Sequence, residues 1–263
     1  MSASATLWER NAAFRTRVLA GEPVFGTFLS MGSTVSAEVC GSAGFDWCLV
    51  DLEHGLGSEA SLHDEVVAVE LTGAAALVRI ESGAALRIGR VLDHGAAGVM
   101  VPRVRSAAEA AQIVSWARYP PSGVRGVALS ARGAGSGTAG ADVVGLIDAS
   151  ITTLIQIENE AALAEAEAIA AVDGVDVLFV GPNDLTHSLA IPGRFDDPRY
   201  LDALAAVAAA ARAAGKAAGV MLRSAQDVAR HHDLGYSFFA LSTDAGLLGS
   251  TTRSALAAMR AAV

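Results

Sequence analysis

Acidic, basic and imidazole side chains follow several short apolar runs of the chain, where they could perform acid–base or metal chemistry. Asp51 and His54 follow the second run, Arg79 ends the third, and Glu158 and Asp184 follow the fifth and sixth. Two carboxylates from neighbouring parallel strands can hold one hard divalent cation between them, with water or substrate oxygens completing its coordination. These residue types therefore predict a metal-assisted reaction.

Each of these side chains also has a purely structural interpretation. A carboxylate beside His54 can prepare the imidazole for work as a general base, but a single histidine in a loop is often a surface residue. Arg79 either pairs with a carboxylate or meets an anionic ligand, since a buried strand rarely ends in an unpaired arginine. Asp184 could equally cap a helix, and the residues from Gly181 could offer backbone N–H groups to a carboxylate.

The lysine content narrows the chemistry. Lys216 is the only lysine of the chain, and it precedes the seventh apolar run rather than following it. A Schiff-base aldolase needs a lysine in its active site. If this protein is an aldolase, it must therefore use a metal.

Eight apolar runs without polar alternation must position these residues. Such runs are typical of parallel strands that are buried on both faces, and the stretches between them carry helix caps. Strand alternating with helix eight times predicts an α/β fold, a (β/α)8 TIM barrel, with an extra N-terminal helix from about Thr6 to Leu19. An open doubly wound sheet is the alternative, but no Gly-rich dinucleotide fingerprint follows the first run. The runs are 24–29, 47–50, 76–78, 98–101, 153–157, 175–180, 218–222 and 238–241.

In such a barrel the C-terminal ends of all strands open onto one face, where catalysis takes place. The candidate residues follow strands two, three, five and six, so we expect them to converge there. We treat residues 1–263 as a single barrel domain, because barrels of this kind commonly reach this length. One segment, 123–145, breaks the rhythm with a long Gly-rich stretch containing Arg125 and Arg132. It is either a surface excursion, or a lid or subunit contact that carries an arginine to the site.

The composition excludes several classes of protein. The net charge of −9 argues against a nucleic-acid partner, and no apolar run approaches the roughly 18 residues of a membrane-spanning helix. The first 19 residues mix acidic and basic side chains and have no apolar core, so we expect no secretory signal. Cys40 and Cys48 lie in apolar surroundings and are expected to be reduced core thiols. A cytoplasmic location is expected.

Several strings of the sequence are specific enough to point to a family. The most specific are Tyr-Pro-Pro-x-Gly-x-Arg-Gly at 119–126, Gln-Ile-Glu at 156–158 and Gly-Pro-x-Asp-Leu at 181–185. Together they resemble the HpcH/HpaI aldolase family, the metal-dependent (class II) pyruvate aldolases that include 2-oxo-3-deoxy sugar-acid aldolases. Further likeness lies at 26–28, 45–55, 77–79 and 92–102. The segments 55–57 and 79–81 depart from the family pattern on the aldehyde side, so the resemblance does not specify the aldehyde.

The resemblance implies a role for each candidate residue. Glu158 and Asp184 would ligate a divalent metal, typically Mg²⁺, Mn²⁺ or Co²⁺, which would chelate pyruvate and stabilise its enolate. Arg79 would hydrogen-bond the C2 oxygen, where negative charge develops. His54, oriented by Asp51, would act as acid and base on the C4 hydroxyl.

The remaining residues would surround the metal or bind the substrate. Glu53 and Gln156 resemble groups that lie around the metal ligands, and Gln156 is also expected near the substrate. Gly181, Pro182 and Asn183 would bind the pyruvate carboxylate, with backbone N–H groups of Gly181 and Asn183 as donors. No nucleotide cofactor is expected. The family also implies a homo-oligomer, often a hexamer, in which the last helix is exchanged between subunits.

The reaction expected from this resemblance is reversible cleavage of a 4-hydroxy-2-oxo acid, such as a 2-oxo-3-deoxy sugar acid, to pyruvate and an aldehyde. One alternative is a CoA-ester lyase of the malyl-CoA or citryl-CoA type. That enzyme would need a basic surface for the nucleotide phosphates, and this chain has one lysine and a net charge of −9. The other alternative is a non-catalytic barrel that binds an oxo acid.

Overall fold

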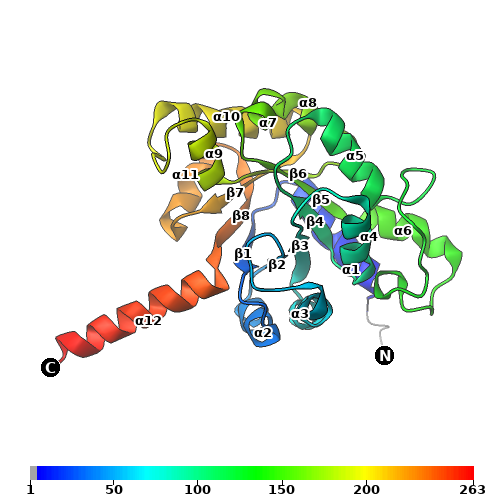
Figure 1. Ribbon diagram of the computed structural model, residues 1–263, viewed down its shortest axis with the longest axis horizontal. Coiled ribbons are helices and arrows are strands. Elements are labelled where there is room, and N and C mark those ends of the chain that lie inside the picture. The colour runs from blue at the N-terminus through cyan, green and yellow to red at the C-terminus, as the bar shows by residue number, and fades with distance from the viewer. Residues whose placement is uncertain (1–4) are drawn as a thin grey trace.

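A closed barrel of eight parallel strands forms the centre of the protein. The computed structural model describes residues 5–263, so residues 1–4 of the expected N-terminal segment lie outside the described residues (Figure 1). Each strand pairs with the next along the chain, and β8 pairs with β1. Closure confirms the predicted TIM barrel and rules out the open doubly wound sheet. The strands are β1 (Val24–Leu29), β2 (Trp47–Asp51), β3 (Ala75–Arg79), β4 (Gly98–Val101), β5 (Thr152–Ile157), β6 (Val177–Val180), β7 (Ala217–Leu222) and β8 (Tyr236–Thr243).

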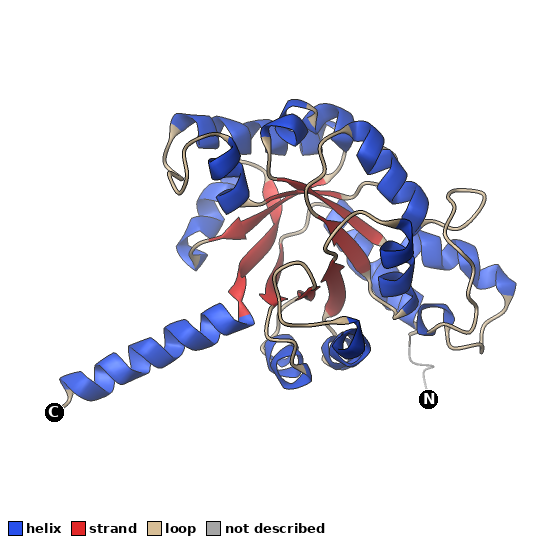
Figure 2. Ribbon diagram, in the orientation of Figure 1, coloured by secondary structure: helices blue, strands red, loops and turns tan. Residues whose placement is uncertain are grey.

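Helices connect the strands and surround most of the barrel, as Figure 2 shows with helices in blue and strands in red. The expected N-terminal helix is present and begins with a capping box between Thr6 and Glu9. The helices are α1 (Leu7–Leu19), α2 (Thr34–Ser42), α3 (Glu59–Leu71), α4 (Ala85–Asp93), α5 (Ala107–Ala117), α6 (Val144–Ser150), α7 (Glu160–Ala164), α8 (Ala166–Ala170), α9 (Pro182–Ser188), α10 (Pro198–Ala213), α11 (Val228–Asp233) and α12 (Asp244–Ala261). Short 3₁₀ helices lie at Arg132–Ala134, Ala141–Val143 and Ala225–Asp227.

Both faces of the strands are buried, which explains why the apolar runs lack polar alternation. Residues that point inward form one apolar cluster, and residues that point outward pack against the helices in a second, larger cluster. Trp47 fills the barrel interior, where its ring stacks on Phe238 at 4.5 Å between centroids. The neighbouring strand leaves room for this ring because residue 26 is glycine: a Cβ at Gly26 would lie 2.1 Å from the indole. The inner cluster thus fills the barrel below its C-terminal opening, the barrel mouth.

The predicted strands agree with the observed ones to within about two residues at most ends. The differences reach two residues at both ends of β8 and before β6, which begins at Val177 although the apolar run suggested Val175. Asp176 instead takes part in side-chain bonding, because its carboxylate accepts hydrogen bonds from the Arg15 guanidinium and from the N–H of Thr153. Among the helix caps expected between the runs, the side chains of Ser106 and Asp197 cap the starts of α5 and α10. Glu109, however, accepts from the N–H of Arg105 rather than that of Ser106, so no reciprocal capping box forms.

The Gly-rich segment 123–145 is anchored to the outside of the barrel. Arg125 is buried, pairs with Asp93 at 2.6 Å and lies 4.4 Å from the ring centroid of Tyr119. Arg132 pairs with Glu70 on α3 and donates to the carbonyl of His94. Neither arginine reaches the barrel mouth, so the structure does not support a lid that carries an arginine to the site.

Two further expectations concern the cysteines and the membrane. Cys40 and Cys48 are both free and buried, as predicted, and burial raises the pKa of the Cys48 thiol to about 12. No helix within residues 5–263 combines the length and the apolar character that crossing a membrane would require.

The last helix, α12, extends from the end of β8 away from the barrel (Figure 1). Of its residues only Asp244 is buried. The Asp244 carboxylate accepts hydrogen bonds from the N–H and the hydroxyl of Ser30 (2.7 and 2.9 Å), the hydroxyl of Ser36 (2.6 Å), and the N–H groups of Met31 (3.3 Å) and Ala245 (2.8 Å). This single carboxylate therefore fastens the start of α12 to the loop after β1 and to α2.

The charge on Asp244 should contribute to stability in a defined pH range. Burial raises the pKa of this carboxyl, but the hydrogen bonds from Ser36, Ser30 and Ala245 outweigh it and lower the pKa below its usual value. A depressed folded-state pKa contributes stability above the unfolded-state pKa of about 3.9, and this stability is lost as the pH falls through the folded-state value. We expect Asp244→Asn to lower the free energy of unfolding at pH 7 by about 1–2 kcal/mol.

Denaturant unfolding at fixed protein concentration, from pH 7 down to pH values below about 4, measures this effect. The difference between parent and variant should shrink over the acid end of that range. The exposed Asp202 on α10 is the matched control, and Asp202→Asn should change little. If Asp244→Asn lowers the free energy of unfolding by the same amount at every pH, the charge on Asp244 does not contribute to stability.

Candidate active site

The alternation of side chains along the strands brings the predicted residues to the barrel mouth. Trp47 and Leu49 belong to the inner cluster of β2, so Asp51, two residues further, also points inward. The same spacing takes Leu77 to Arg79 on β3 and Leu154 to Gln156 on β5. Each inner row thus changes from apolar to polar at the C-terminal end of its strand, and this change forms the site.

A bidentate ion pair between Arg79 and Asp51 lies at this mouth. Asp51 and Arg79 are register partners on neighbouring strands, and the carboxylate accepts from Nε at 2.9 Å and from Nη2 at 2.7 Å. Both side chains are nearly buried, at 3% and 11% exposure. The guanidinium also lies over the ring of Phe28, 5.0 Å from its centroid. Arg79 therefore has the carboxylate partner that its position at the end of a buried strand required.

The chain turns at Leu52, so Asp51, Glu53 and His54 do not continue the strand alternation. Asp51 accepts hydrogen bonds from the backbone N–H groups of Glu53 (3.1 Å) and His54 (3.3 Å). The His54 ring lies beside Glu53 instead, with Nε2 3.7 Å from Oε2. Asp51 thus holds the backbone of the loop that carries the imidazole. The carboxylate beside the ring is that of Glu53, whereas we expected Asp51 to orient the ring.

Arg103, on the loop after β4, connects Glu53 to Glu158. Its Nε and Nη2 each lie 3.0 Å from Glu53 Oε1, and its backbone N–H donates to Glu158 Oε1 at 2.6 Å. The other Glu158 oxygen accepts from the Gln156 side chain at 2.8 Å. Burial raises the pKa of the Glu158 carboxyl; the Arg103 N–H opposes this rise, and the nearby carboxylates of Asp184 and Glu53 add to it. Glu158 thus lies in a setting that favours a neutralising partner.

Asp184 completes the group of acids at the mouth. It lies exposed in the first turn of α9 and, with Glu158, Glu53 and His54, lines one cavity of about 510 Å³. No group of three or more His, Cys, Asp or Glu side chains in residues 5–263 is close enough to hold a metal ion. The two predicted ligands are therefore a pair, which would leave most of the coordination sphere to water or substrate.

Gly181, the residue before α9, approaches Glu158 closely. A Cβ at this position would lie 2.9 Å from Glu158 Oε2 and 3.3 Å from the Gln156 amide nitrogen. No side chain caps the start of α9, so the N–H groups of its first turn have no side-chain acceptor. Asn183 is exposed in this turn, next to Asp184. Only glycine fits between this turn and Glu158.

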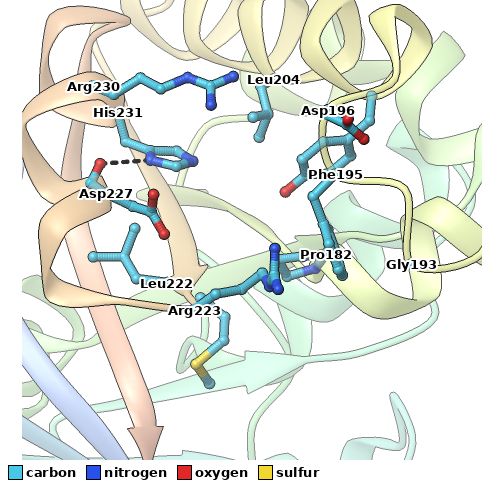
Figure 3. A pocket seen from close by; sticks show the side chains of 12 residues that line it. Pro182, Gly193, Phe195, Asp196, Leu204, Leu222, Arg223, Asp227, Arg230 and His231 are labelled. Atoms are coloured by element: carbon cyan, nitrogen blue, oxygen red, sulfur yellow. Dashed lines mark hydrogen bonds between the residues drawn. The ribbon is translucent and has the colours of Figure 1, made fainter.

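Pro182 faces a second, smaller pocket of about 210 Å³ on the β6 and β7 side of the mouth. Figure 3 shows it with the Arg223 side chain extending toward Pro182. The Arg223 guanidinium lies 4.3 Å from the ring centroid of Phe195, and His231 Nδ1 donates a hydrogen bond to the carbonyl of Asp227 (Figure 3). The predicted residues are thus divided, because Glu53, His54, Glu158 and Asp184 line the larger cavity and Pro182 the smaller.

Sequence reasoning gave too little weight to two residues at the mouth. Arg103 follows the end of β4 just as Arg79 ends β3, and this shared position was the available signal. Phe28 reads as an ordinary core residue, and only the inner-row spacing on β1 places it beneath Arg79. Thr243 and Asp244, where β8 ends and α12 begins, serve instead as cap and anchor of α12.

Comparison with known proteins decides the family. The family model described as HpcH/HpaI aldolase/citrate lyase matches residues 25–250. The chain belongs to this family. It is 36% identical to a hydroxypyruvate/pyruvate aldolase of Agrobacterium fabrum, over 92% of this chain and 91% of the relative. It is 35% identical to a 5-keto-4-deoxy-D-glucarate aldolase of Klebsiella pneumoniae, over 91% and 93% of the two chains.

Solved structures agree with this assignment. The crystal structure of an HpcH/HpaI aldolase/citrate lyase family protein from Burkholderia cenocepacia superposes with a TM-score of 0.90 at 32% identity, covering 95% of this chain and 99% of the other. The resemblance inferred from the sequence motifs is therefore confirmed, both in family and in fold.

The close approach at Gly181 predicts a specific defect. We expect Gly181→Ala to fold, because the residue lies at a helix start with φ −93, which alanine adopts freely. The added methyl group should displace the Glu158 carboxylate and weaken divalent-metal affinity by about tenfold or more. Isothermal titration with Mn²⁺ measures this affinity. Gly145→Ala on α6 is the matched control, because no described atom lies within 4 Å of an added Cβ there and the helical backbone accepts alanine. Unchanged Mn²⁺ affinity in a folded Gly181→Ala protein would contradict the assignment of Glu158.

Proposed function

We propose that the protein is a metal-dependent aldolase that reversibly cleaves a 4-hydroxy-2-oxo acid to pyruvate and an aldehyde. The observation that carries this proposal is the shared cavity: Glu158, Asp184 and His54 line it together. Membership of an aldolase and citrate lyase family, and relatives named for pyruvate and sugar-acid aldolases, support it. The 2-oxo-3-deoxy sugar acids are one substrate class within this proposal.

The charges at the mouth fit a divalent cation. Arg79 and Arg103 carry two positive charges, which balance Asp51 and Glu53 in direct ion pairs. No ion pair within residues 5–263 involves Glu158 or Asp184. The nearby Asp184 carboxylate adds to the rise that burial causes in the pKa of Glu158. Gln156 Oε1 is also buried, and it has no hydrogen-bond partner in the described part of the chain. Two carboxylates and an amide oxygen are ligands that Mg²⁺ and Mn²⁺ prefer, so these residues suit Mg²⁺, Mn²⁺ or Co²⁺.

In this proposal the side chains divide the work. A bound cation would polarise the 2-oxo group and stabilise negative charge on it. The Arg79 guanidinium has five N–H groups, of which its carboxylate partners engage at most three, and the others would meet the C2 oxygen. His54, 59% exposed, would hold and return the proton of the C4 hydroxyl. The N–H groups at Gly181 and Asn183 would bind the substrate carboxylate.

Exchange of the pyruvate methyl protons in D₂O, followed by NMR, tests the donor half of this reaction without knowledge of the aldehyde. We expect no exchange in metal-stripped protein and exchange after addition of Mg²⁺, Mn²⁺ or Co²⁺. Glu158→Ala and Asp184→Ala should each reduce it by about a hundredfold or more. Glu167→Ala, at an exposed position on α8, is the control and should exchange like the parent.

The outcomes of this experiment separate the alternatives. Full exchange in either carboxylate variant would remove the metal assignment. If the folded parent protein shows no exchange with any of the three metals, the result would instead favour a CoA-ester lyase or a non-catalytic barrel.

We also propose that the protein is a homo-oligomer in which α12 packs on a neighbouring subunit, with a hexamer as the family's common form. The support is the exposure of this helix, which leaves Leu248, Leu256 and Met259 in solvent in the isolated chain. At 100° per residue these three side chains lie on one face. An apolar face on a helix that extends away from its own barrel is typical of an interface. The reduced, buried cysteines further support a cytoplasmic protein.

Light scattering coupled to size exclusion tests the role of α12. We expect the parent to run as an oligomer, and the double variant Leu256→Glu with Met259→Glu to shift to a smaller species, because two charges would replace the apolar contact. Ser254→Glu lies on the opposite face of the helix and is the matched control. A monomeric parent, or an unchanged mass in the double variant, would contradict this proposal.

A further inference from the structure

Arg103 is held in an unusual conformation at the edge of the active-site cavity. Its φ is 60°, in the left-handed region that residues with a Cβ rarely adopt. This conformation directs the backbone N–H to Glu158 at 2.6 Å while the side chain reaches Glu53 at 3.0 Å. Backbone outliers of this kind cluster at functional sites. The backbone N–H of Arg103 therefore donates to Glu158, and its guanidinium binds Glu53.

The guanidinium has capacity beyond its contact with Glu53. Nε and Nη2 face that carboxylate, but the side chain is 70% exposed, so the remaining N–H groups are open to the cavity. Arg105, two residues further along the same loop, lines this cavity as well. Two arginines of one loop thus line the space that His54, Glu158 and Asp184 also line.

The position of this loop relates it to the acceptor aldehyde. In the proposed function His54 exchanges a proton with the C4 oxygen, which originates from the aldehyde, and Glu158 and Asp184 hold the pyruvate half. The substituent on C4 must therefore extend into the part of the cavity beyond His54. Arg103 and Arg105 are the cationic side chains that line this cavity.

We propose that Arg103, assisted by Arg105, selects an acceptor aldehyde that carries a carboxylate. The inference rests on the proposed function and specifies its substrate class. A guanidinium binds a carboxylate through short, charge-assisted hydrogen bonds, which a neutral hydroxyl cannot equal. Glu160 also lines the cavity, so the arginines do not make the cavity positive as a whole. The carboxylate of the acceptor would therefore be held by direct contact with the guanidiniums.

The carboxylate of the acceptor takes no part in bond making. In the addition direction, pyruvate C3 loses one proton and forms the new carbon–carbon bond to the aldehyde carbon, and the aldehyde oxygen gains one proton to become the C4 hydroxyl. No oxidant or further reactant is needed. Arg103 therefore acts on the choice of acceptor and leaves the chemistry at C3 unchanged.

The test compares two acceptors of equal carbon number, glyoxylate and glycolaldehyde, in addition of pyruvate by the metal-loaded full-length protein. We expect the parent to favour glyoxylate in kcat/KM. Arg103→Met should reduce the ratio of the two kcat/KM values by about tenfold or more, the loss expected for one hydrogen bond between charged groups. Arg103→Lys should restore part of it, and Arg105→Met should have a smaller effect. Arg212→Met, at an exposed position on α10, is the matched control.

Exchange of pyruvate methyl protons, measured on the same samples, separates this inference from the proposed function. Arg103→Met keeps the backbone N–H on Glu158 but removes the ion pair with Glu53, so the readout is the ratio of the two acceptor kcat/KM values, which cancels any loss of exchange common to both acceptors. Retained exchange with an unchanged acceptor ratio, or a parent that prefers glycolaldehyde, would overturn the role of Arg103 alone. Loss of exchange in both Arg103→Met and Arg103→Lys would assign the side chain to placing Glu53 and would likewise overturn it. A parent without exchange would overturn the proposed function and this inference together.

Discussion

The ion pair between Arg79 and Asp51 is the contact on which the geometry of the barrel mouth depends. A guanidinium that is 11% exposed is costly to bury without a partner, and its neighbour in the strand register supplies a bidentate one. Asp51 also holds the backbone of Glu53 and His54, so the same carboxylate that neutralises Arg79 sets the loop after β2. From Glu53 the contacts continue through Arg103 to Glu158. Charges therefore alternate across the mouth from β2 to β5, and each group limits the position of the next.

The part of this arrangement that follows from strand periodicity was predictable from the sequence. A two-residue alternation takes Trp47 and Leu49 to Asp51, and Leu77 to Arg79, so both polar groups had to reach the same end of the barrel. The eight runs and their closure follow from the same local pattern, since strands buried on both faces must be apolar throughout. Phe28 could have been assigned to the floor of the site by this rule alone.

Contacts made by loops were not predictable in this way. The chain turns at Leu52, which ends the alternation and leaves the His54 ring beside Glu53 rather than Asp51. Arg125 and Arg132 find their partners, Asp93 and Glu70, on helices distant in the sequence, and no local pattern specifies such pairs. The left-handed conformation of Arg103 depends likewise on Glu158, 55 residues away. Periodicity determines which residues reach the mouth, and tertiary contacts determine which of them touch.

Residues on strands and residues on loops differ in how freely they can be substituted. The residues proposed to serve the pyruvate half, such as Arg79 and Gln156, lie on strands, where a one-residue shift would turn an apolar side chain toward the charges at the mouth. Arg103 and Arg105 lie on a loop, where side chains can be replaced without disturbing the inner row. Their contact with the rest of the site is limited to Glu53 and to one backbone N–H, and the N–H would survive any substitution except proline. A barrel built in this way can keep Arg79 and the proposed metal ligands, Glu158 and Asp184, in place while the loop after β4 adapts to a new acceptor.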